Sequence, residues 1–150
     1  MPGDIDKIKK IREATNLSVG EISKALAEAN GDETRALEIL KSRGVEIAAK
    51  KSAREIKEGV VECYVHSTKK LGAMVELGSE TDFVSRNEDF RKLAKELAMQ
   101  IASMNPQSAE ELLAQPYIKD PSLTIADLLH QQIARLGENI KIGKFTRLEI

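Results

Sequence analysis

Few residues in this chain could act as catalysts, and the single cysteine and the two histidines are the first to consider. Cys63 and His66 lie in one alternating segment that predicts a β-strand. Their odd spacing points the side chains to opposite faces of a strand, so the pair is poorly placed for thiolate–imidazole chemistry. We expect Cys63 to be a buried strand residue, His66 to lie at the surface and His130 to face solvent. An enzyme that uses Cys63 stays open as an alternative.

The motifs of common nucleotide- and metal-dependent enzymes are absent from the sequence. It contains no G-x-x-x-x-G-K-[ST] phosphate loop, no dinucleotide-binding fingerprint and no H-E-x-x-H zinc motif. No group of residues has the spacing of metal ligands. We therefore expect no catalytic residues, no bound cofactor and no metal site.

The most distinctive stretch runs from Ser79 to Phe90 and places an acid beside a large apolar ring at the start of a helix. In one interpretation, Thr81 caps the helix, Asp82 lies at the positive end of the helix dipole and Phe83 packs inward. However, adjacent residues on a helix diverge by about 100°, so part of this corner must face outward. Without the residues of an enzyme, an exposed polar and apolar corner indicates a protein that acts by binding another protein.

Composition limits the class of protein further. The chain has 150 residues, of which 41% are apolar and only 3% aromatic, so we expect one compact domain with a small satellite and an aliphatic core. A net charge of -1 gives no general attraction to nucleic acid or to anionic membranes. No apolar run is long enough to span a bilayer, and the start of the chain does not resemble a targeting peptide. We expect a soluble, cytoplasmic protein without direct nucleic-acid or membrane partners.

Residues 1–44 carry the pattern of a self-contained three-helix module. An apolar stripe with charges between its members predicts a first helix. Ser18 and Glu21 form a capping box for a second helix. Asp32 can cap a third helix that ends at Gly44.

Residues 45–57 lose the apolar stripe and gather lysine and arginine, which predicts a basic linker and leaves open whether it is helical. We favour a solvated connector; a contact for an acidic or phosphate-bearing partner is the alternative.

Residues 58–150 are expected to form an α+β core domain. The alternation from Gly59 to Leu77 predicts a β-hairpin, and a strongly periodic helix follows from Phe90. Pro116 and Pro121 mark a loop before a last helix. Residues 139–150 return to strand character, with a change of phase near Gly143-Lys144 that suggests a bulge. These elements predict a three-stranded antiparallel sheet packed with helices.

Several segments occur in an order that is more specific than any single motif. They are Ile11-Arg12-Glu13-Ala14-Thr15, Lys24-Ala25-Leu26-Ala27-Glu28-Ala29-Asn30-Gly31-Asp32, a cationic linker, a hairpin, Glu80-Thr81-Asp82-Phe83-Val84, Asn87-Glu88-Asp89-Phe90 and Gly137-Glu138-Asn139-Ile140. Over nearly the whole chain, this order resembles the translation elongation factor Ts family, in its short form with a single half-core.

The resemblance implies a guanine-nucleotide exchange factor for elongation factor Tu, the GTPase that delivers aminoacyl-tRNA to the ribosome. Such a factor binds the GDP-bound and the nucleotide-free GTPase and performs no covalent chemistry. The resemblance also implies that the N-terminal module has a ubiquitin-associated-like (UBA-like) fold and docks on the GTPase domain, while the corner reaches toward the magnesium region. The matching positions are Thr81, Asp82, Phe83 and Val84 at the corner, and Arg12, Thr15 and Lys24 in the module.

The chain also departs from the family pattern. Asn16 replaces the usual glycine after the threonine of the first helix, and Val19-Gly20 replaces a methionine pair. Longer members have a second half-core, so the single half-core here implies a homodimer, with a monomer as the alternative. A protein of another class stays open: a UBA-like adaptor that binds a folded partner or a ribosomal component without exchange activity.

Overall fold

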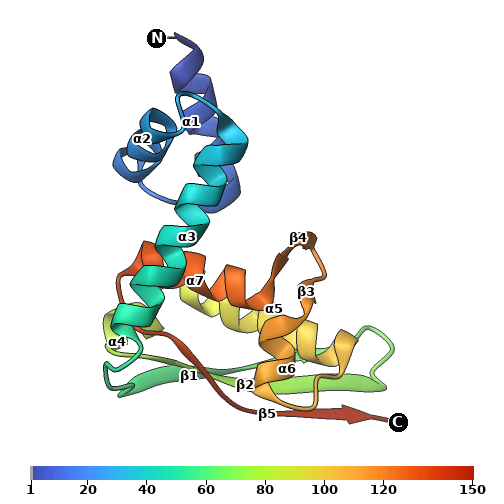
Figure 1. Ribbon diagram of the computed structural model, residues 1–150. Coiled ribbons are helices and arrows are strands. Elements are labelled where there is room, and N and C mark those ends of the chain that lie inside the picture. The colour runs from blue at the N-terminus through green and yellow to red at the C-terminus, as the bar shows by residue number, and fades with distance from the viewer. Residues whose placement is uncertain (1) are drawn as a thin grey trace.

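The computed structural model describes residues 2–150, and its α+β architecture confirms the expected fold class. A bundle of N-terminal helices stands at one end of the molecule, and a sheet covered by helices forms the other end (Figure 1). The helix α3 runs between the two ends (Figure 1). The two predicted sites, in the N-terminal helices and at the corner around residues 81–84, therefore lie on separate parts of one molecule (Figure 1).

Three helices lie within residues 2–51, and capping residues set the starts of the second and the third. They are α1 (Pro2–Thr15), α2 (Val19–Glu28) and α3 (Glu33–Lys51). The capping box of Ser18 and Glu21 is formed in full, and the Asp32 side chain accepts a hydrogen bond from the backbone N–H of Arg35, as expected. Asn16 follows α1 with φ of 57°, a left-handed conformation that asparagine tolerates better than most residues. This conformation explains how asparagine can occupy a position where glycine is usual.

The predicted end of the third helix at Gly44 is wrong, because α3 continues to Lys51. A glycine inside a helix costs about 1 kcal/mol relative to alanine. Here Gly44 is buried close to the backbone of His130 on another helix, and Ala48 one turn later is also buried. Tertiary packing therefore sustains the helix through part of the segment expected to be a linker, and only residues 52–57 of that segment are non-helical.

The sheet contains β1 (Glu58–Val65), β2 (Leu71–Ser79) and β5 (Lys141–Glu149), all antiparallel in the order β1-β2-β5. Val75 pairs with Phe145 and Leu77 pairs with Ile142, so two residues of β5 oppose one residue of β2. This register shift confirms the bulge expected at Gly143-Lys144.

Four helices and a small second sheet complete the fold. They are α4 (Asp82–Ser85), α5 (Glu88–Met104), α6 (Ala109–Ala114) and α7 (Ile125–Leu136), with β3 (Pro116–Tyr117) paired to β4 (Asp120–Thr124). The expected loop around Pro116 and Pro121 is thus a short hairpin. Gln100, buried on α5, donates to the Pro116 carbonyl at 3.0 Å and accepts from the Ile118 N–H at 3.1 Å. This long-range contact orders a segment that proline alone suggested was irregular.

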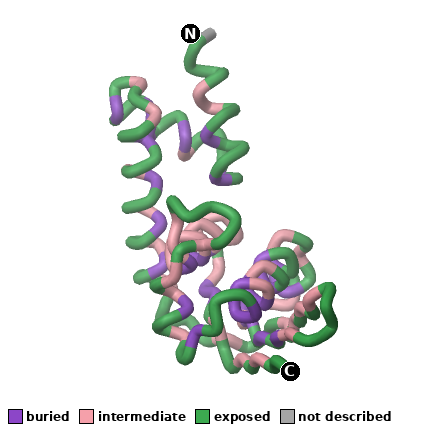
Figure 2. Tube along the Cα trace, turned by 90° about the vertical axis from the view of Figure 1, so that its right-hand side faces the viewer, coloured by how far each residue is buried: buried purple, intermediate pink, exposed green. Residues whose placement is uncertain are grey.

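Two separate hydrophobic clusters stabilise the two ends of the molecule. One lies within the module and includes Ile11, Ile22 and Leu40. The other lies between the sheet and α5, α6 and α7, where Phe90 and Leu97 are completely buried. Figure 2 shows buried stretches of chain in both parts.

The expected burial of Cys63 is wrong, because its side chain is exposed. The buried residues of β2, Ala73, Val75 and Leu77, lie opposite Tyr64, Glu62 and Val60 in the antiparallel register. Directly opposed residues share a face, so the even-numbered residues of β1 face the helices and Cys63 faces away from them. The strand alternates as predicted, but pairing with β2 puts its more apolar side outward.

Candidate functional site

The predicted corner is formed where β2 ends and the single-turn helix α4 begins. Thr81 has the extended backbone of an N-cap residue, and Val84 and Ser85 of α4 are buried. Phe83 points the other way and is 86% exposed. The geometry therefore favours the outward alternative for this ring.

Asp82 lies beside the projecting ring at the first position of α4. Its carboxylate forms an ion pair with Arg86 at 3.4 Å, and the side chains are 47% and 74% exposed respectively. Ion pairs at such exposed positions contribute about 0–1 kcal/mol, so a partner can replace this contact at small cost. The corner thus presents a carboxylate and an aromatic ring side by side.

Thr81 is held by a residue from a distant part of the chain. Its side chain makes no capping bond to α4. Instead, Glu138 accepts hydrogen bonds from the N–H groups of Glu80 and Thr81 at 3.1 and 2.9 Å and from the Thr81 hydroxyl at 2.6 Å. Sequence reasoning did not assign Glu138 a role; its signals were its place in the Gly137-Glu138-Asn139-Ile140 segment and directly after the glycine that ends α7.

The residues predicted in the N-terminal module lie at the other end of the molecule. Arg12 and Lys24 are exposed, whereas Thr15 is only 5% exposed. The Thr15 hydroxyl donates to the Ile11 carbonyl at 2.8 Å and accepts from the Leu17 N–H at 3.3 Å, so it ties off the end of α1. The fold does not bring these residues to the corner (Figure 1).

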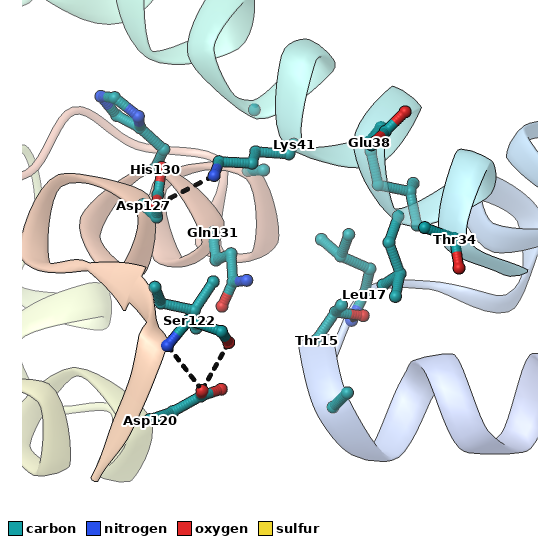
Figure 3. Close-up of a pocket in the computed structure, with 16 residues that line it drawn as sticks. Thr15, Leu17, Thr34, Glu38, Lys41, Asp120, Ser122, Asp127, His130 and Gln131 are labelled. Atoms are coloured by element: carbon teal, nitrogen blue, oxygen red, sulfur yellow. Dashed lines mark hydrogen bonds and ion pairs between the residues drawn. The ribbon is translucent and has the colours of Figure 1, made fainter. Parts of the chain in front are cut away.

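A cavity of about 400 Å³ separates the module from α7 and β4. Figure 3 shows Lys41 of α3 reaching across to Asp127 of α7, and the two side chains form an ion pair at 3.2 Å. Burial raises the pKa of Asp127, but hydrogen bonds from Thr124 and the contact with Lys41 outweigh it and hold the pKa below its usual range. Of the predicted site residues, only Thr15 lines this cavity. The cavity is therefore a junction between the two ends of the molecule, away from the corner.

His130 is only partly exposed, which corrects the expectation that it faces solvent. Its Nδ1 atom is buried without a hydrogen-bond partner. Burial lowers the pKa of His130, and the charge of Asp127 opposes this change. The cause is the continuation of α3, because Gly44 packs against the backbone of His130 and covers this side of α7.

The second candidate chemistry, at Cys63 and His66, gains no support from the geometry. The Nδ1 atom of His66 lies 2.9 Å from the Tyr64 hydroxyl, so the imidazole pairs with a phenol rather than with a thiol. Among residues 2–150, no group of three or more histidine, cysteine or acidic residues is placed to hold a metal ion. None of the helices in that range is long and apolar enough to cross a membrane.

Comparisons with known proteins find similar sequences that cover both the N-terminal module and the core domain. The family model described as elongation factor TS matches residues 80–150, from the corner to the end of the sheet. The elongation factor Ts of Acetivibrio thermocellus is 38% identical over 189 positions, which cover 96% of this chain and 88% of that protein. That of Thermodesulfovibrio yellowstonii is 36% identical over 95% of this chain and 94% of its own length. That of Oleidesulfovibrio alaskensis is 38% identical and covers 95% of both chains.

The matched stretch of 189 positions is longer than this chain of 150 residues, so these relatives carry additional residues within the match. Relatives that are at least 36% identical nevertheless span almost the whole sequence, and the chain belongs to the elongation factor Ts family.

Proposed function

We propose that this protein is a guanine-nucleotide exchange factor for elongation factor Tu and acts in translation elongation in the cytoplasm. The observation that supports it best is the exposure of Phe83, at 86%, on a corner whose neighbouring residues are buried or hydrogen-bonded. Burying such a ring yields about 1.5–3 kcal/mol, so folding alone gives no reason to expose it. A partner protein that buries the ring on binding accounts for its exposure in the free protein.

In this proposal the corner weakens GDP binding by displacing the elements that hold it. The phosphates of a bound nucleotide rest on backbone N–H groups and on a shared Mg²⁺ ion, which demands nearly ideal octahedral geometry. Phe83 acts as an apolar wedge between elements of the GTPase, and Asp82 perturbs the polar groups around the metal. Thr81 and Val84 support the two from within the corner.

The exchange cycle follows from thermodynamic linkage. If the factor prefers the nucleotide-free GTPase over the GDP-bound form, bound nucleotide must weaken the factor by the same ratio. Abundant GTP then displaces the factor and completes the cycle. No covalent bond is broken, so the factor itself needs no catalytic residue and no cofactor.

We propose that the module and the corner bind the GTPase together. Arg12 and Lys24 are exposed on the module, and the hydrogen bonds of Thr15 fix the end of α1. A partner that touches both ends must extend along α3, which suits a large folded protein. In this proposal the chain consists of a UBA-like module (1–44), a basic connecting segment (45–57) and a core domain (58–150).

We further propose a homodimer, formed through the face of the sheet that the helices leave bare. The helices lie on one side of the sheet (Figure 1). On the other side, Val61, Val65, Met74 and Leu148 are 63%, 55%, 49% and 74% exposed, with the Cys63 side chain among them. Contiguous exposed apolar patches of this kind mark interaction surfaces, and a twofold axis lets one patch bury its own copy.

The rate of release of labelled GDP from elongation factor Tu tests the exchange proposal. We expect the parent protein to accelerate release. Phe83→Ala should reduce that acceleration about tenfold or more, because it removes a ring whose burial is worth about 1.5–3 kcal/mol. Asp82→Ala tests the second group of the corner. Cys63→Ser, on the bare face of the sheet, should change little.

Three outcomes would count against the proposal or its mechanism. Binding of elongation factor Tu without faster release would favour the adaptor alternative, and loss of activity in Cys63→Ser would favour cysteine chemistry. Normal exchange in both corner variants would contradict the wedge and leave the family assignment unchanged.

A further inference from the structure

The turn that follows α7 connects three distant parts of the chain. Gly137 ends the helix in a left-handed conformation, with φ of 78°, and the two residues after it point in different directions. Glu138 reaches the corner at Glu80 and Thr81. Asn139 is 2% exposed, and its side chain donates to the Arg54 carbonyl at 2.8 Å, just beyond the end of α3.

The Glu138 carboxylate caps the backbone that leads into α4, whose own N-cap residue Thr81 makes no side-chain capping bond. One oxygen accepts hydrogen bonds from the two consecutive N–H groups that precede α4, and the other accepts a hydrogen bond from the Thr81 hydroxyl at 2.6 Å. Hydrogen bonds to an ionised acceptor are shorter and roughly twice as strong as neutral ones. The cap comes from a residue 57 positions away from Thr81, so it fixes the corner relative to α7.

Hydrogen bonding also runs in the reverse direction. The carboxylate of Glu80 accepts a hydrogen bond from the Asn139 N–H at 2.8 Å and lies 3.7 Å from the guanidinium of Arg54. Each of the two segments, the corner and the turn after α7, therefore contributes a carboxylate that accepts hydrogen bonds from the backbone of the other. Because hydrogen bonds hold both the corner and the turn after α7, the corner cannot rotate without breaking several of these bonds at once.

We propose that Glu138 is a positioning residue for exchange, which holds the corner so that Phe83 projects at a fixed angle. The inference rests on the proposed function and names a residue of the same mechanism. A helix of one turn has no intrinsic stability, because the first turn of a helix costs more entropy than its single hydrogen bond returns. With Phe83 almost fully exposed, its ring has little protein surface to hold it, so its direction depends on the backbone that Glu138 fixes.

Steady-state exchange with the 150-residue chain tests this role. We expect Glu138→Ala to lower the maximal rate of GDP release about ten- to hundredfold, since small misplacements of working groups have effects of this size. The concentration of factor at half-saturation should change much less, because the module still docks. Glu138→Gln keeps an oxygen for the two N–H groups and an NH₂ for the Thr81 hydroxyl, so it should restore most of the rate. Glu110→Ala is a matched control, because Glu110 is an exposed acid in the first turn of α6.

Amide hydrogen exchange gives a readout that does not depend on the partner. In Glu138→Ala the amides of Glu80 and Thr81 should exchange faster, while those of α5 keep their protection. The inference is overturned if Glu138→Ala retains the parental maximal rate, if Gln rescues no better than Ala, or if α5 loses protection as well. If the parent protein fails to accelerate GDP release, the proposed function fails, and the amide measurement still decides whether Glu138 holds the corner.

Discussion

Two phenylalanines near the corner have opposite surroundings. Phe83 is 86% exposed, whereas Phe90 on the next helix is completely buried. Phe83→Ala should therefore change the free energy of unfolding by no more than about 0.5 kcal/mol. Phe90→Ala should cost about 3–5 kcal/mol, because it leaves a cavity in the core. Urea unfolding measures both, and a large loss of stability in Phe83→Ala would show that its ring packs against the protein.

His130 makes stability depend on pH in a predictable direction. Burial lowers its pKa in the folded protein, whereas an unfolded chain titrates histidine near a pKa of about 6.5. Below that pH the unfolded state binds a proton that the folded state does not, so stability rises with pH between the lowered pKa and about 6.5. Above this window His130 contributes no further change.

Replacing His130 with a side chain that cannot titrate tests this dependence. We expect His130→Gln to flatten the rise of the melting temperature with pH over the window below 6.5. Melting curves of both proteins at several pH values measure the two slopes. Equal slopes would mean that His130 titrates alike in the folded and unfolded states.

At the scale of elements, α3 is one continuous helix that connects the module rigidly to the core domain. Lys41 pairs with Asp127 at 3.2 Å, and Lys51 donates to the Gly137 carbonyl at 2.9 Å, so contacts to α7 extend along the second half of the helix. The packing surface between them is formed by Gly44 and Ala48. The position of the module thus depends on the helical state of residues 45–51.

A proline in this part of α3 distinguishes a strut from a flexible linker. Glu46 is exposed, and Glu46→Pro removes a helical hydrogen bond and clashes with the preceding turn, which costs about 3 kcal/mol or more. Glu46→Ala is the matched control and should be nearly neutral. We expect a lower urea midpoint and weaker acceleration of GDP release for the proline variant only. Equal midpoints would mean that the segment behaves as a connector.

At the scale of the whole molecule, the bare face of the sheet decides the oligomeric state. Its apolar side chains come from all three strands, so a charge at any one of them would be buried in a dimer. Leu148→Lys places an ammonium group on the edge strand β5, where the monomer leaves the side chain 74% exposed. It should weaken dimerisation at least about tenfold, a change of about 1.4 kcal/mol.

Sedimentation at several concentrations measures this shift. Ile5→Lys is the matched control, because Ile5 is 68% exposed on α1, at the other end of the molecule from the sheet. We expect the control to keep the mass of the parent protein. A parent that is monomeric at all concentrations would refute the dimer.

Signals that act within a few residues were readable from the sequence. The capping box of Ser18 and Glu21 sets the start of its helix, and the bulge at Gly143-Lys144 followed from a change of phase. The capping box links residues three positions apart, and the change of phase is visible in the alternation within one strand, so local residue types predict both. They suffice for the α+β class and for the order of elements.

Contacts between distant segments decided what the sequence left open. The register of β1 on β2 turned Cys63 outward, α7 sustained α3 beyond Gly44, and Glu138 closed on Thr81 across 57 positions. The direction of Phe83 is also a tertiary result, since either face of a short helix could have met the core. The sequence by itself determined which residues form the corner; packing and long-range hydrogen bonds decided how it is held and which side chain it presents, because local preferences cannot specify partners that are far away along the chain.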